Sequence, residues 1–221
     1  MQFKTLFFAA ALTAQSVFAM SSSQQGQIKQ NEKDVQSAQI HQLEDLAHTF
    51  QAQQSQMNGM LTIGAPPLNA SAIVISTNAV SAILTAGAIV ANNATPATLY
   101  QVLPVIINSL TNITNSVVSN AGPIITTPNI GNYGPVDQAA ILTALDVLTD
   151  ANTAFINAYV GPNGLVNNSL ARGPIGVVLN LIERNIVNLA GALIARTPAF
   201  TQEAQTLLSQ LHSSLALTIS F

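Results

Sequence analysis

The sequence has no cysteine, and only 7% of its 221 residues are charged. The lack of cysteine excludes disulfide-stapled lipid-transfer proteins, knottins and hydrophobin-like films, so packing alone must stabilise the fold. The few charges are also unevenly placed, because no Asp, Glu, Lys or Arg occurs between Asp45 and Asp137. With 48% hydrophobic residues, the surface of such a chain must be built from Asn, Gln, Ser and Thr.

The N-terminal sequence MQFKTLFFAAALTAQSVFA has one lysine, an apolar run from Leu6 to Leu12, and Val17 and Ala19 before a predicted cut. This pattern is typical of a secretory signal peptide, and the run is shorter than the roughly 20 residues that span a bilayer. We therefore expect a signal peptide over residues 1–19 and a secreted protein, extracellular or in a cell wall. Removal of Lys4 takes the formal net charge from −3 to −4, which attracts neither nucleic acid nor an anionic membrane.

The stretch 95–120 carries the clearest helical signal. Its apolar residues recur in alternating steps of four and three, which places them on one face of an α-helix. They are Leu99, Leu103, Ile106, Leu110, Ile113 and Val117. Pro104 either bends this helix or marks its true start, and Gly122 is placed to end it.

The rest of the chain predicts further helices after a flexible leader over residues 20–30. They cover 31–61, 70–93, 136–160, 175–195 and a final stretch from 197 onward, with a breaker-rich loop over 122–135 and Gly161 ending the fourth helix. The predicted fold is all-α, a bundle of five to six antiparallel helices in a single domain over residues 31–221. The helix over 70–93 is apolar on nearly every face and should be central, and small residues around Gly87 predict a close approach there.

The helix over 70–93 is also long enough to span a membrane. Ser76, Thr77 and Asn78 interrupt its apolar sequence, and no basic residue flanks it. We therefore expect a core helix and no transmembrane anchor.

Four Asn-x-Ser/Thr triplets would accept N-linked glycans in a eukaryotic host. They begin at Asn69, Asn93, Asn112 and Asn167. Glycans at these sites would supply the solubility that charged residues do not. A chain rich in Asn, Ser and Thr also produces such triplets by chance, so both interpretations stay open.

Candidate chemistry is sparse. His41, Glu44, Asp45 and His48 have i, i+4 spacing that a metal could bridge, but a solvated helix face with ordinary ion pairs is favoured. Asp146 and Asp150 could resemble a glycosidase carboxylate pair, yet one helix turn more simply turns both to water. There is no Gly-x-Ser-x-Gly, no His-Glu-x-x-His, no P-loop and no dinucleotide fingerprint. We expect no enzyme, no metal and no cofactor.

The ending ALIARTPAF over residues 192–200, followed by Leu207, Leu211, Leu215 and Phe221, resembles the fungal hydrophobic surface-binding protein family, which includes cell-wall galactomannoproteins. The likeness in sequence covers about the last thirty residues. The resemblance implies a secreted helical bundle that adsorbs to hydrophobic surfaces or holds a long-chain fatty acid between helices, without catalytic residues.

If such a lipid slot exists, the apolar seams place it beside five residues that also fit an ordinary core. They are Leu103, Ile106, Leu110, Phe155 and Tyr159. Two other functions stay open: a structural cell-wall glycoprotein without a small-molecule ligand, and a secreted effector that binds a host protein. The sequence leaves the oligomeric state undetermined.

Overall fold

The structure is a computed structural model that describes residues 68–94, 99–127, 133–162, 164–165 and 172–219, together with separate positions between 30 and 52. The chain divides into two compact units, Met1–His41 and Gln42–Phe221. In the first unit the described residues are helical and exposed, and Gln30 Nε2 donates to Asp34 Oδ1 at 3.0 Å. The predicted signal peptide, and all of the predicted leader except Gln30, lie outside the described residues.

Helix α2, Ala70–Asn92, begins at a side-chain cap that the sequence analysis did not predict. The Oδ1 atom of Asn69 accepts a hydrogen bond from the Ala72 N–H at 2.7 Å, which satisfies one free donor of the first turn. Along the buried face of α2, the hydroxyl groups of Thr77 and Ser81 donate to the carbonyl oxygens one turn earlier. The helix can therefore bury two polar residues without leaving their hydroxyl groups unpaired.

The close approach that the small residues around Gly87 predicted, by another backbone or a ligand chain, is made instead by side chains. A Cβ atom at this position would lie 2.5 Å from Ile113 Cδ1 and 3.0 Å from Phe155 Cε2. The side chains of two other helices therefore occupy the space that any larger residue would need.

The next helical stretch continues beyond its predicted end. Helix α3, Leu99–Ser116, leads through a π-helical turn, Val117–Ala121, into α4, Gly122–Thr126. The prediction that Gly122 ends the helix and opens a loop was wrong over residues 122–126. Pro123 lies in the first turn of α4, the part of a helix that tolerates proline best, and the helical path continues past it.

Pro104 lies inside α3, so a helix start near this proline was also wrong. The proline removes one backbone hydrogen bond, and burial of Leu103, Ile106 and Leu110 offsets that loss.

The second half of the fold holds α5, Pro135–Val160, α6, Arg172–Ile194, and α7, Thr201–Ile219. Gly161 ends α5 as predicted, and its N–H donates to the Asn157 carbonyl oxygen at 2.9 Å. Helix α6 begins three residues before the predicted start. The last predicted helix is divided into a 3-10 turn, Pro198–Phe200, and α7.

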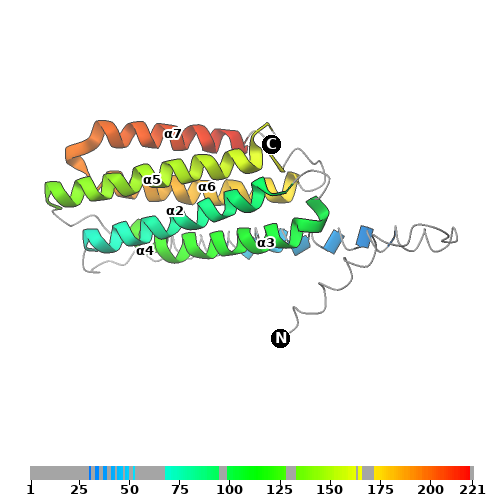
Figure 1. Cartoon of the computed structure of the whole chain (residues 1–221). Coiled ribbons are helices and arrows are strands. Elements are labelled where there is room, and N and C mark those ends of the chain that lie inside the picture. The colour runs from blue at the N-terminus through cyan, green and yellow to red at the C-terminus, as the bar shows by residue number, and fades with distance from the viewer. Residues whose placement is uncertain are drawn as a thin grey trace. The chain divides into compact units, whose positions relative to one another are not determined.

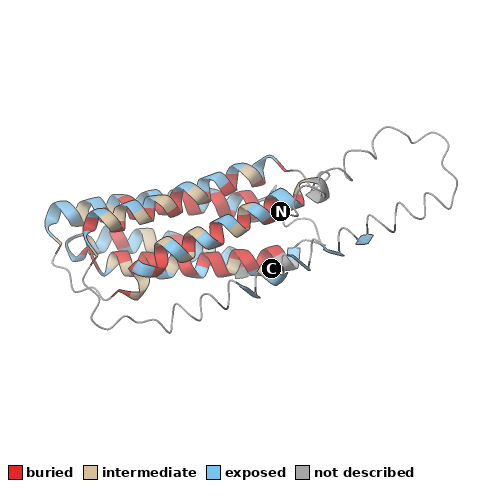
Figure 2. Ribbon diagram, turned by 90° about the horizontal axis from the view of Figure 1, so that it is seen from below, coloured by how far each residue is buried: buried red, intermediate tan, exposed pale blue. Residues whose placement is uncertain are grey.

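The long helices lie side by side, and α2, α3, α5, α6 and α7 run alternately in opposite directions along the chain (Figure 1). Helix α2 packs most extensively against α5, and α7 covers α5 and α6. Buried residues face the interior of the bundle and exposed residues face outward (Figure 2). The described ranges contain six α-helices and no strand, which confirms the all-α bundle.

Candidate functional site

The five residues predicted to line a lipid slot lie together in the core. Leu103, Ile106 and Leu110 come from α3, Phe155 and Tyr159 from α5, and all five are 0% exposed. The two aromatic rings are in contact, with centroids 4.9 Å apart and planes inclined by 53°. A lipid chain at this position would have to displace packed side chains, because the same space is already filled.

Two polar side chains are enclosed by this core, one from each of two neighbouring helices. Asn152 on α5 and Glu183 on α6 are both 0% exposed, and none of their side-chain oxygen or nitrogen atoms has a hydrogen-bond partner among the described residues. Burial raises the pKa of Glu183 to about 8, and the nearby Asn152 amide lowers it only in part. The Asn152 amide is therefore close enough to affect the carboxyl group, although the two side chains do not form a hydrogen bond of regular geometry.

The hydroxyl group of Tyr159 is a third unpaired group in the core. Burial raises the pKa of this phenol above its usual value, so the group stays neutral. A neutral phenol in an apolar core gives no counter-charge to Glu183.

Asn152 and Glu183 were not predicted as buried polar residues, although the sequence contains a signal for both. Asn152 is spaced i+4 from Leu148 and i−3 from Phe155, which places it on the apolar face of α5. Glu183 has the same spacing between Leu179 and Ile186. A polar residue at a position where the helical repeat is otherwise apolar therefore predicts that both side chains are buried.

Arg196 is a second residue that the sequence analysis did not identify as buried. It follows α6 and is 3% exposed. Its guanidinium donates to the carbonyl oxygens of Ala192 at 2.6 Å, Ile124 at 3.0 Å and Thr127 at 2.7 Å. The Arg-Thr-Pro part of the C-terminal motif therefore contains a residue that ties the end of α4 to the end of α6.

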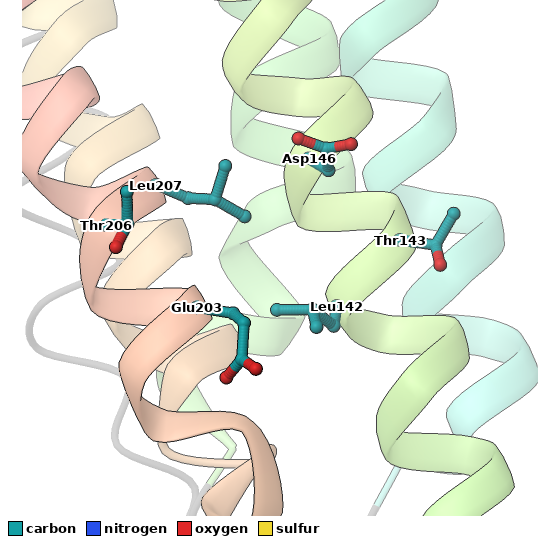
Figure 3. A pocket seen from close by; sticks show the side chains of 6 residues that line it. All are labelled: Leu142, Thr143, Asp146, Glu203, Thr206 and Leu207. Atoms are coloured by element: carbon teal, nitrogen blue, oxygen red, sulfur yellow. The ribbon is translucent and has the colours of Figure 1, made fainter.

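An open groove of about 390 Å³ lies between α5 and α7. Leu142 from α5 and Leu207 from α7 both point into it, and Asp146 and Glu203 are the acidic residues of its lining (Figure 3). Thr143 and Thr206 complete the lining. Asp146 and Asp150 are both exposed, as the solvated-face interpretation of this pair expects.

Among helices α2 to α7, the residues that carry charge or are histidine lie only from α5 onward. Helices α2, α3 and α4 and the π turn contain no Asp, Glu, Lys, Arg or His. Their exposed positions nevertheless include large apolar side chains, with Ile75 68%, Ile89 58% and Val105 47% exposed. We call these three helices and the turn between them the uncharged half, and α5, α6 and α7 the charged half.

Among the described residues, four helical stretches are apolar and long enough to cross a membrane, by length and composition alone. They are Ala70–Asn92, Val102–Thr126, Pro135–Val160 and Ile175–Ile194. The highest mean hydropathy, 1.9, belongs to α2. The most apolar helix is therefore also the helix that exposes Ile75 and Ile89.

Three of the four predicted glycosylation sites are described, and their asparagines are exposed. Asn69 caps α2, Asn93 follows its end, and Asn112 lies within α3. Asn167 lies outside the described residues. Attachment of glycans stays a prediction.

The candidate metal residues are helical and exposed. His41, Glu44, Asp45 and His48 all have this description, and the part of the chain that the structure describes contains no group of three His, Cys, Asp or Glu side chains suited to a metal ion.

Comparison of the chain with protein-family models, with curated proteins and with solved structures finds no match.

Proposed function

We propose that this protein is a secreted, non-enzymatic protein that adsorbs to hydrophobic surfaces through its uncharged half. The observation that carries the proposal is the combination of exposed isoleucines with a complete lack of Asp, Glu, Lys, Arg and His over α2, α3 and α4. A face without charge loses no ionic hydration when it meets an apolar phase, so its exposed aliphatic groups can drive binding.

The exposed stripe of α2 has the geometry of a contact face. Ile75 and Ile89 are 14 residues apart, about 21 Å along the helix and close to four full turns, so both lie on one side. Ala82 and Ala86 lie between them on the same side and are also exposed. Burial of both isoleucine side chains would contribute on the order of 3 kcal/mol to adsorption.

The charged half would keep the adsorbed protein hydrated on its other side. Its exposed ionisable side chains come from all three of its helices. They include Asp137, Asp146, Asp150, Arg184, Glu203 and His212. Because these groups are costly to remove from water, they favour an orientation in which α2 meets the surface.

The signal-peptide pattern and the resemblance to fungal hydrophobic surface-binding proteins both support this function. An internal lipid slot beside Phe155 and Tyr159 is the other form of the proposal, and it requires the closed core to open. Under either form, we expect the partner to be an apolar surface or a fatty acid rather than nucleic acid, and we expect no cofactor or transmembrane anchor. A structural cell-wall glycoprotein and a host-binding effector are the alternatives.

Adsorption to octadecyl-coated silica from dilute solution tests the proposal. The double substitution Ile75→Asp with Ile89→Asp should weaken binding about tenfold or more, because it places charge in the contact face. Val147→Asp with Val177→Asp, at exposed positions of the charged half, is the matched control and should bind as the unaltered protein does.

Equal adsorption of both double variants would refute this contact face. Solvent extraction of natively purified protein, followed by mass spectrometry, tests the other form. A stoichiometric fatty acid in the extract would favour the internal slot over surface adsorption.

A further inference from the structure

The bundle holds a carboxyl group that none of its neighbours neutralises. Among the described residues, three fully buried side chains have no hydrogen bond at any polar atom, namely Asn152, Tyr159 and Glu183. Glu183 is the one whose ionisation would place a full charge in the core. Its surroundings therefore decide which protonation state the closed bundle can hold.

Several other buried polar side chains in this fold are satisfied within their own helices. The hydroxyl groups of Thr114 and Thr149 donate to the carbonyl oxygens of Leu110 and Leu145 at 2.8 and 2.9 Å, and the Asn185 amide donates to the Leu181 carbonyl oxygen at 2.9 Å. A carboxylate cannot use this solution, because it has only acceptor atoms and helix carbonyl groups are acceptors too. Glu183 can fit such a core only when it carries its proton.

The described helices packed against α6 supply no opposite charge. Helices α3 and α4 and the π turn contain no Asp, Glu, Lys, Arg or His. The ionisable groups of α5 and α7, apart from buried Tyr159, are all exposed: Asp137, Asp146, Asp150, Glu203 and His212.

The arginines on or next to α6 do not neutralise Glu183 either. Arg172 and Arg184 are exposed. The guanidinium of Arg196 donates to three backbone carbonyl oxygens near the C-terminal end of α6. Within the part of the chain that the structure describes, no cation is thus placed to stabilise an ionised Glu183 in the closed core.

We propose that Glu183 is a pH-sensitive latch. Its neutral carboxyl group allows α6 to close against Asn152 on α5, and its ionisation opens this contact between α5 and α6, the α5–α6 seam, to water. The proton leaves to solvent, and the carboxylate then gains the water donors that the core does not offer. The device belongs to the fold itself and does not depend on the proposed adsorption.

The direction of the pH dependence follows from the two states of the chain. In the unfolded chain Glu183 ionises at the ordinary glutamate pKa, whereas burial in the folded bundle raises its pKa to about 8. Between these two values the folded state holds one more proton than the unfolded state. The folding equilibrium constant should therefore fall about tenfold for each unit of rising pH across this window, and level off above it.

Urea unfolding from pH 5 to 9 tests the latch with three proteins. We compare the unaltered protein with Glu183→Gln, which copies the neutral carboxyl group, and with Glu203→Gln, an exposed glutamate on α7. The unaltered protein and Glu203→Gln should share the tenfold fall per pH unit, and Glu183→Gln should lack it. A Glu183→Gln protein with the same slope as the unaltered protein would overturn the proposal.

Two further measurements keep the test decisive. The first is carbon NMR of unaltered protein labelled with ¹³C at its glutamate carboxyl groups. One of the four glutamate signals should titrate near pH 8. Titration of all four in the ordinary acidic range would refute the latch, and this result does not require Glu183→Gln to fold.

The second measurement uses thiol labelling. Since the chain has no cysteine, Ile186→Cys gives a single buried thiol on the Glu183 face.

The rate of thiol labelling in Ile186→Cys, divided by the rate in the double variant with Glu183→Gln, should rise several-fold from pH 6 to 8.5. A ratio that does not change with pH would show that the seam stays closed, and would contradict opening.

Discussion

Single residues decide how closely the helices of this bundle approach one another. Gly87 is the clearest case, because the Ile113 and Phe155 side chains occupy the space where its Cβ atom would lie. Gly191 on α6 is the opposite case, since it is exposed and no atom lies within 4 Å of an added Cβ. The same residue type therefore serves packing at one position and only adds backbone freedom at the other.

Gly87→Val should lower the free energy of unfolding by about 2 kcal/mol, because three added carbon atoms must push apart the packed side chains of α3 and α5. Gly191→Ala should raise it by about 0.5 to 1 kcal/mol, since alanine favours the helix and meets no neighbour. Urea unfolding of both variants at one pH measures the difference. Stabilisation by Gly87→Val would contradict the close packing of α2.

At the scale of helices, the apolar periodicity predicted where the long elements lie, and the positions of breakers predicted their ends less well. The seam from Leu103 to Val117 gave the buried face of α3 correctly. Gly122 was expected to stop the helix, but the helical path continues through the π turn to Thr126, and Ile124 is buried there. Burial against α6 is a tertiary effect, and local residue preferences do not contain it.

The location of the candidate lipid site could be predicted from the sequence, but its packing could not. Both seams placed Leu110 and Phe155 in one apolar region, as the structure confirms. Whether that region is closed depends on how the side chains of separate helices fill it. Arg196 escaped prediction for the same reason, because its acceptors on α4 lie about 70 residues away in the sequence.

Arg196 joins α4 to α6, so its replacement should loosen both helices. Arg196→Lys keeps the charge but cannot donate to three carbonyl oxygens in the same fixed geometry, and we expect a loss of about 2 kcal/mol in unfolding free energy. Arg184→Lys at an exposed position of α6 is the control and should stay within about 0.5 kcal/mol of the unaltered protein. Urea unfolding measures the unfolding free energy of both variants. An equal change in the two would show that these hydrogen bonds contribute little.

At the scale of the whole bundle, the distribution of charge divides helices α2 to α7 into two chemically different halves. The uncharged half exposes Ile75, Ile89 and Val105, whereas the exposed carboxyl and guanidinium groups of these helices belong to the charged half. This asymmetry is already present in the sequence as the stretch between Asp45 and Asp137 without Asp, Glu, Lys or Arg. The fold converts it into an asymmetry in space, because the helices of each half are consecutive in the chain.

The most direct test of the proposed function is the orientation of the adsorbed protein. The lack of cysteine allows single dye-labelled thiols at Ala82→Cys on the exposed stripe of α2 and at Ala154→Cys on the exposed face of α5. On binding to octadecyl-coated silica, we expect a polarity-sensitive dye at position 82 to shift to the blue and the same dye at position 154 to keep its emission in water. A blue shift at position 154 alone, or equal shifts at both positions, would contradict adsorption through the uncharged half.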